Sequence, residues 1–104
     1  MPMIEAQLTL GAAATQLSTA VSKGVAIGSL SCRHIKISPP AHTTYVGSSE
    51  VSATKGFPIA ASSVNTNLTA TEIGPSSGDG PINTNEVYFF GTAADVVQVI
   101  LVVP

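Results

Sequence analysis

Short segments in which apolar residues occupy every second position recur along this sequence, separated by clusters of Gly, Pro, Ser and Asn. Residues two apart in a β-strand lie on the same face, so the pattern is typical of strands with one face on a core and one in solvent. The sequence therefore predicts an all-β fold, a small antiparallel β-sandwich or barrel of jelly-roll-like form. At 104 residues the chain has the usual size of one domain, which we expect to span 1–104.

The first half of the chain holds two predicted strand regions. Residues 4–10 alternate and predict a first strand that ends at Gly11, whereas 12–20 is ambiguous between a short helix and an irregular segment. From 25 to 37 the alternation returns. It predicts one strand face made by Arg33, Ile35 and Ile37 and an opposite face made by Cys32, His34 and Lys36.

The end of the sequence holds the two strongest strand predictions. Residues 86–90 and 94–103 are joined by Gly91-Thr92-Ala93, which predicts a hairpin. The run 96–103 is apolar on both faces, which predicts a strand at the centre of a covered sheet or at an edge covered by another chain. The Gly- and Pro-rich stretch 74–81 predicts an exposed loop.

Charged residues are scarce, at 10% of the chain against roughly 25% in ordinary soluble domains. Two explanations stay open: surface buried between subunits, or surface solvated by Ser, Thr and Asn. The net charge of −2 and the four Lys and Arg residues give no basic stripe, so we expect no nucleic-acid partner. No apolar run reaches the roughly 20 residues of a membrane-spanning helix, and 1–10 lacks the basic start of a signal peptide. We expect a protein made in the cytoplasm, with no membrane partner.

The residues that could carry chemistry do not form a recognisable site. Cys32, His34 and His42 lie close in sequence, but zinc needs three or four ligands with supporting groups, and no nearby carboxylate is evident. No Gly-x-Ser-x-Gly elbow marks a nucleophilic serine. The acidic residues fit surface charge better than a pair of glycosidase carboxylates, because aromatic residues are few. We expect no enzyme activity, no cofactor and no metal.

One segment carries a resemblance to a known class of proteins. Tyr45-Val46-Gly47 leads through a Ser- and Thr-rich turn to Gly56-Phe57-Pro58-Ile59, and later come 87–95 and the Val- and Ile-rich run 96–103. This order resembles small structural proteins of tailed bacteriophages. The resemblance covers about the C-terminal two thirds of the chain, from near Arg33, and not the first thirty residues.

The resemblance implies a virion β-sandwich or barrel that decorates or joins the capsid, often as a symmetric oligomer. We expect a capsid cement or decoration subunit on the capsid surface, a homotrimer that binds and stabilises the shell of major capsid protein. Residues 1–30 are expected to supply a strand or arm to contacts between subunits. The expected partner contacts are Ile4, Leu8, Leu10, Phe57, Pro58 and Ile59.

Two other virion roles stay open. One is a host-attachment or carbohydrate-binding module that uses the loop 74–81, which the small number of aromatic residues disfavours. The other is a head-to-tail connector or tail subunit, which would form larger rings from the same fold.

Overall fold

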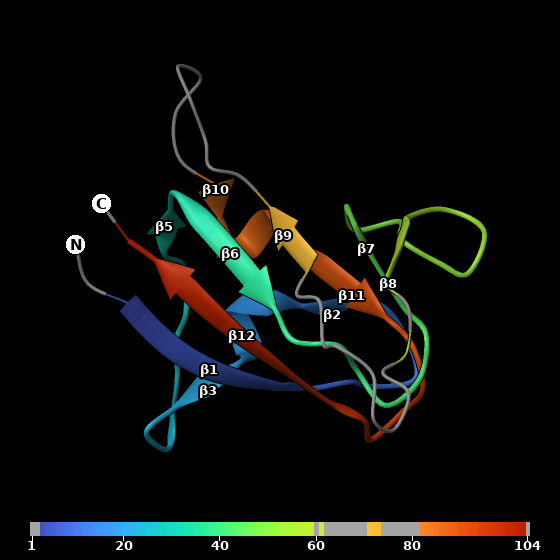
Figure 1. Ribbon diagram of the computed structural model, residues 1–104, viewed down its shortest axis with the longest axis horizontal. Coiled ribbons are helices and arrows are strands. Elements are labelled where there is room, and N and C mark those ends of the chain that lie inside the picture. Colours follow the sequence, from blue (N-terminus) through green and yellow to red (C-terminus); the bar gives the residue numbers. More distant parts are fainter. Residues whose placement is uncertain (1–2, 60, 62–70, 74–81, 104) are drawn as a thin grey trace.

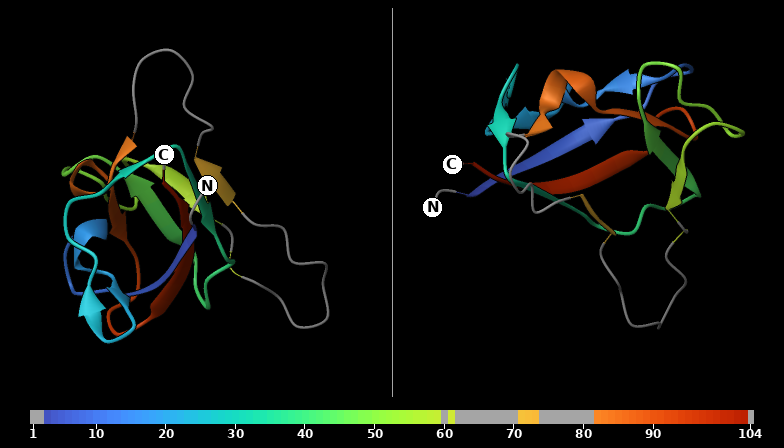
Figure 2. Two further views of the ribbon diagram at one scale, coloured as in Figure 1. Left: turned by 90° about the vertical axis from the view of Figure 1, so that its left-hand side faces the viewer. Right: turned by 90° about the horizontal axis from the view of Figure 1, so that it is seen from above.

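The computed structural model describes residues 3–59, 61, 71–73 and 82–103 (Figure 1). Its strands form two antiparallel sheets of six and four strands and a separate two-stranded ribbon. The two larger sheets face each other without closing into a barrel, so the predicted all-β fold is confirmed and takes the form of a sandwich (Figure 2). In the described ranges no helix has the length and apolar character needed to cross a membrane.

The six-stranded sheet, sheet A, is organised around two long strands from distant parts of the sequence. Strands β1 and β12 pair antiparallel from Met3 opposite Val102 to Thr9 opposite Val96. The order is β4-β3-β1-β12-β6-β9. The bounds are β1 Met3–Thr9, β3 Val21–Ser22, β4 Val25–Ala26, β6 His34–Ile37, β9 Thr71–Ile73 and β12 Val96–Val102.

The second sheet, sheet B, covers the inner face of sheet A. Its order is β2-β11-β7-β8, with bounds β2 Thr15–Gln16, β7 Thr44–Gly47, β8 Phe57–Ile59 and β11 Tyr88–Phe90. The ribbon consists of β5 Ser31–Cys32 and β10 Ile82–Asn83. Two 3-10 turns, η1 Leu17–Thr19 and η2 Thr84–Glu86, lie beside β2 and β11.

The core lies between the sheets and follows the alternation of the sequence. Sheet A and its continuations contribute to the core the side chains of Ala6, Leu8, Leu10, Ile35, Ile37, Val97, Val99 and Leu101. Sheet B contributes those of Val46, Ile59 and Phe89. The prediction of a central position for the C-terminal run is confirmed, because β12 lies between β1 and β6. Only one of its faces is buried, however, since Val96 and Gln98 are exposed.

The predicted hairpin between the last two strands is wrong. Strand β11 pairs with β2 and β7 in sheet B, whereas β12 pairs with β1 and β6 in sheet A. The connection crosses from one sheet to the other. It is held at the end of β1, where Leu10 N–H donates to Asp95 O and Ala94 N–H donates to Leu10 O, both at 2.8 Å. Ala94 has a φ of 72°, so the chain turns sharply there instead of folding back.

The predicted common face of Cys32 and His34 is also wrong. Cys32 pairs with Ile82 in the ribbon, and His34 belongs to β6 in sheet A. Arg33 interrupts the alternation between them, and its N–H donates to Val102 O at 2.7 Å. Cys32 therefore points into the core together with Ile35.

A two-residue turn joins β3 to β4. Its central residues, Lys23 and Gly24, have φ values of 54° and 82°, and positive φ at both positions is the requirement of a type I′ hairpin. Strand β3 touches β1 through a single pair, Gln7 opposite Val21. The hairpin thus leaves β1 after one pair, toward the lower left in Figure 1.

Candidate functional site

Three of the six predicted contact residues are buried in the chain's own core. Leu8, Leu10 and Ile59 keep 0%, 3% and 2% of their surface exposed, which leaves nothing for a partner to touch. The prediction is wrong for these three because they occupy the inward positions of their segments. Ile4 is partly buried, while Phe57 and Pro58 are exposed.

Phe57 is an isolated aromatic side chain at the outer edge of sheet B. It is 63% exposed, although it pairs in the ladder opposite Val46. Pro58 follows it on the edge strand β8 and has no N–H to offer another strand. This edge is therefore unsuited to sheet extension, and Phe57 offers a side-chain contact there.

The two histidines each meet a carboxylate and not a metal-ligand cluster. His42 Nδ1 lies 2.7 Å from Asp95 Oδ2, and His34 Nε2 lies 2.6 Å from Glu72 Oε1. The second contact is close, but His34 Nε2 makes no hydrogen bond with any described residue. Within the ranges described, no three His, Cys, Asp or Glu residues gather where they could hold a metal ion. Both carboxylates come from distant segments, which is why sequence spacing did not reveal them.

Cys32 is a core residue. It is fully buried, and burial raises the pKa of its thiol because the charged thiolate loses its hydration. Its Sγ lies 3.8 Å from Leu30 O, a weak contact for a protonated thiol. A buried, protonated thiol is a poor nucleophile and a poor metal ligand.

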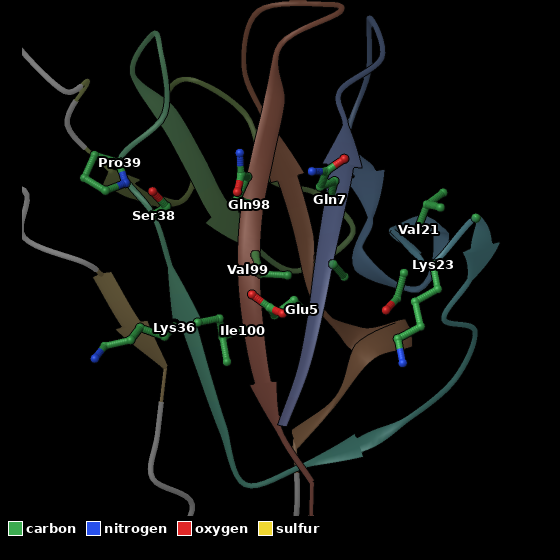
Figure 3. A pocket seen from close by; sticks show the side chains of 13 residues that line it. Glu5, Gln7, Val21, Lys23, Lys36, Ser38, Pro39, Gln98, Val99 and Ile100 are labelled. Atoms are coloured by element: carbon green, nitrogen blue, oxygen red, sulfur yellow. The ribbon is translucent and has the colours of Figure 1, made fainter. Parts of the chain in front are cut away.

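The outer face of sheet A carries a groove of about 630 Å³ (Figure 3). Its floor mixes polar and apolar side chains: Gln7 and Gln98 lie opposite each other on β1 and β12, and Glu5 lies opposite Ile100. The β3–β4 hairpin with Lys23 forms one side, and the end of β6 with Lys36, Ser38 and Pro39 forms the other. None of the described residues that line it is aromatic, so it lacks the flat apolar platform on which sugar rings stack.

A second cleft of about 660 Å³, here named the β1 cleft, lies between the start of β1 and the hairpin. It is lined by residues 3–5, by Ser22, Lys23 and 25–27, and by Leu30. Met3 and Val25 are both 69% exposed, the highest values among the large apolar side chains described. Lys23-Gly24 between β-formers is a recognisable hairpin signal, but the sequence does not show that this hairpin leaves β1 and opens a cleft beside it.

Comparison of the chain with protein-family models, with curated proteins and with solved structures finds no match. The resemblance to phage structural proteins thus depends on the sequence pattern in 45–59 and 87–103.

Proposed function

We propose that this chain is a structural subunit of a bacteriophage virion, a cement or decoration protein that binds the major capsid protein and stabilises the assembled shell. The observation that carries the proposal is the placement of the two resembling segments. Residues 45–59 form β7 and β8, and 87–95 contain β11, which pairs directly with β7 from Tyr88 opposite Gly47 to Phe90 opposite Tyr45. The two segments thus make one continuous part of sheet B (Figure 1).

The exposed apolar side chains support a role in contacts with neighbouring subunits. Strand β8, which carries the exposed Phe57, lies toward the right of Figure 1. The start of β1 and the β3–β4 hairpin, which carry the exposed Met3, Val21 and Val25, lie toward the left. Interface cores are poor in charge and rich in such side chains. Two different patches on one subunit suit contacts with two different neighbours, one of them a second copy, as in a symmetric homotrimer.

The host-attachment alternative receives less support. The loop 74–81, which this alternative expects to bind a glycan, lies outside the described residues. The groove on sheet A has polar groups for a sugar but no aromatic side chain among its described lining residues. The cement function is therefore the one we put forward.

Binding to capsids tests the proposal. Purified protein is added to empty shells of the major capsid protein from the same phage, and both the bound amount and the melting temperature of the shell are measured. We expect saturable binding and a higher melting temperature, because a ligand at 100 times its Kd stabilises the state that it binds by about 2.7 kcal/mol per site. Phe57→Ser should weaken binding without unfolding the exposed edge. Absence of binding, or binding to host cells or glycans alone, would refute the proposal.

A further inference from the structure

The backbone of β1 turns alternate residues toward opposite edges. Leu10 N–H donates to Asp95 O on the β12 side, so the even-numbered residues of β1 face β12. On β12, Gln98 O accepts from Ser38 N–H on the β6 side, so the odd-numbered residues of β12 face β1. The register places even residues of β1 opposite odd residues of β12, in agreement with both observations. Met3, Glu5 and Gln7 therefore direct their N–H and C=O groups to the other edge.

On that other edge, only Gln7 has a strand partner among the described residues. It pairs with Val21, and continuation of the ladder would bring Lys23 opposite Glu5. Lys23 instead has a φ of 54° and begins the hairpin turn, so β3 ends there. The backbone groups of Met3 and Glu5 are left facing the β1 cleft. Such a strand edge is a ready template for another strand.

The walls of the β1 cleft complement this edge. Ile4, Ile27 and Leu30 are partly buried and pack against the core from the inner side. Glu5 and Lys23 lie toward the groove on the outer face, because both line it as well. A strand placed in the cleft would meet apolar side chains on one face and polar groups with solvent on the other.

We propose that the β1 cleft binds an extended polypeptide segment of another protein, with apolar residues at alternate positions, which adds a strand to sheet A along residues 3–5. Main-chain hydrogen bonds to Met3 and Glu5 hold such a segment, and the apolar wall selects its inward side chains. A folded second copy fits less well, because the sheet behind its edge strand would meet the β3–β4 hairpin. The inference follows from the backbone of β1 and holds whether or not the partner is a capsid protein.

The test uses the full chain, labelled with ¹⁵N, and a blocked model peptide, acetyl-Thr-Val-Thr-Val-Thr-amide. In an antiparallel pair, residues that exchange hydrogen bonds turn their side chains to the same face. The central threonine of the peptide would therefore bond to Glu5 and point outward with it, while the valines point inward. We expect saturable chemical-shift changes confined to residues 3–5 and 21–30, with slower amide exchange at Glu5.

Two N-methylated peptides separate strand addition from simple apolar contact. N-methylation of the central threonine removes the N–H that faces Glu5 and should weaken binding about tenfold, whereas N-methylation of a valine, whose N–H points away, should have little effect. Equal binding of both peptides would overturn the proposal.

Two matched variants place the site. Val25→Lys puts a charge on a wall of the cleft and should weaken binding about tenfold, while Val96→Lys makes the same change at an exposed valine outside it. Both positions are exposed, so both variants should fold. No saturable shift at any soluble peptide concentration, or equal loss in both variants, would overturn the proposal. Concentration-dependent shifts at residues 3–5 without peptide would also overturn it, in favour of a second copy as the occupant.

Discussion

Gly56 precedes the exposed Phe57 and is the glycine with the tightest surroundings among those described. Its φ is 153°, and a Cβ built there would lie 2.5 Å from Val51 Cγ2 and 3.2 Å from Val46 O. Val51 is itself buried, so its side chain would have to leave its present packing to relieve the contact. Gly56→Ala should therefore destabilise the fold by two separate mechanisms.

The magnitude follows from adding these mechanisms. A backbone conformation that only glycine adopts readily costs another residue about 1–3 kcal/mol, and overpacking costs about 1–3 kcal/mol. The smaller entropy of the unfolded chain with alanine offsets about 0.4–1 kcal/mol. We expect Gly56→Ala to lower the free energy of unfolding by about 3 kcal/mol, out of about 5–15 kcal/mol for a domain of this size.

Gly24→Ala is the matched control. Gly24 also has positive φ, at 82°, but no atom lies within 4 Å of its built Cβ. It should therefore cost about 1 kcal/mol or less, from backbone strain alone. Urea unfolding followed by circular dichroism gives both values.

The double variant Val51→Ala with Gly56→Ala isolates the steric part. Val51→Ala alone should cost about 2 kcal/mol, because it removes a buried side chain. Since it also removes the Cγ2 atom that the new Cβ would strike, the double variant should be about 1–2 kcal/mol more stable than the sum of the single effects. Additive effects, or equal costs for Gly56→Ala and Gly24→Ala, would refute the steric reasoning.

Three further predictions concern single groups. Thr84 is fully buried, and its hydroxyl donates to Gly28 O at 2.7 Å and accepts from Leu30 N–H at 2.9 Å. Thr84→Val should therefore lower the free energy of unfolding in urea by about 2–3 kcal/mol, and Thr84→Ser should lower it clearly less. Equal costs would contradict a hydrogen-bonding role. Burial raises the pKa of the Cys32 thiol, so the contribution of the thiol to stability should be complete below about pH 8.5, the ordinary thiol pKa, and should decline above it. The variant Cys32→Ala should lack this decline. A thiol reagent should modify Cys32 far more slowly in the native protein than in the unfolded chain. Asp95→Asn removes the charge that faces His42 and should lower stability by less than about 1 kcal/mol, because the His42 side chain is 61% exposed; a larger loss would show that the contact is not screened by solvent.

The sequence predicts strands well where alternation alone decides them. β1 and β12 bury every second residue, as the positions of Leu8, Val97 and Leu101 show. It fails where a single residue changes the alternation, as Arg33 does between Cys32 and His34, because a break in the ladder has no signature in composition.

Pairing partners were harder to predict than strands. Gly91-Thr92-Ala93 suits a hairpin locally, but the contacts of Leu10 with Ala94 and Asp95 carry the chain to the other sheet instead. Those contacts join residues far apart in the sequence, and local turn preference carries no information about them.

Exposure of the predicted contact residues followed from the sequence only in part, for a related reason. Phe57 and Pro58 are exposed on the edge strand β8, whereas alternation in 4–10 marks Leu8 and Leu10 equally well as core or as contact residues. The β1 cleft depends on where β3 separates from β1, and this is visible only once the register is known.

The pairing of β1 with β12 also determines when this protein can fold. The two central strands of sheet A come from distant parts of the sequence, so Met3 can pair only after Val102 has been made. Until then β1 lacks its partner on the β12 side, and the inner face of sheet B lacks the layer that covers it. The core therefore cannot be completed before β12 has been made, and closure over so long a loop is slow. The interval before β12 enters between β1 and β6 is the time at which aggregation competes most strongly with folding.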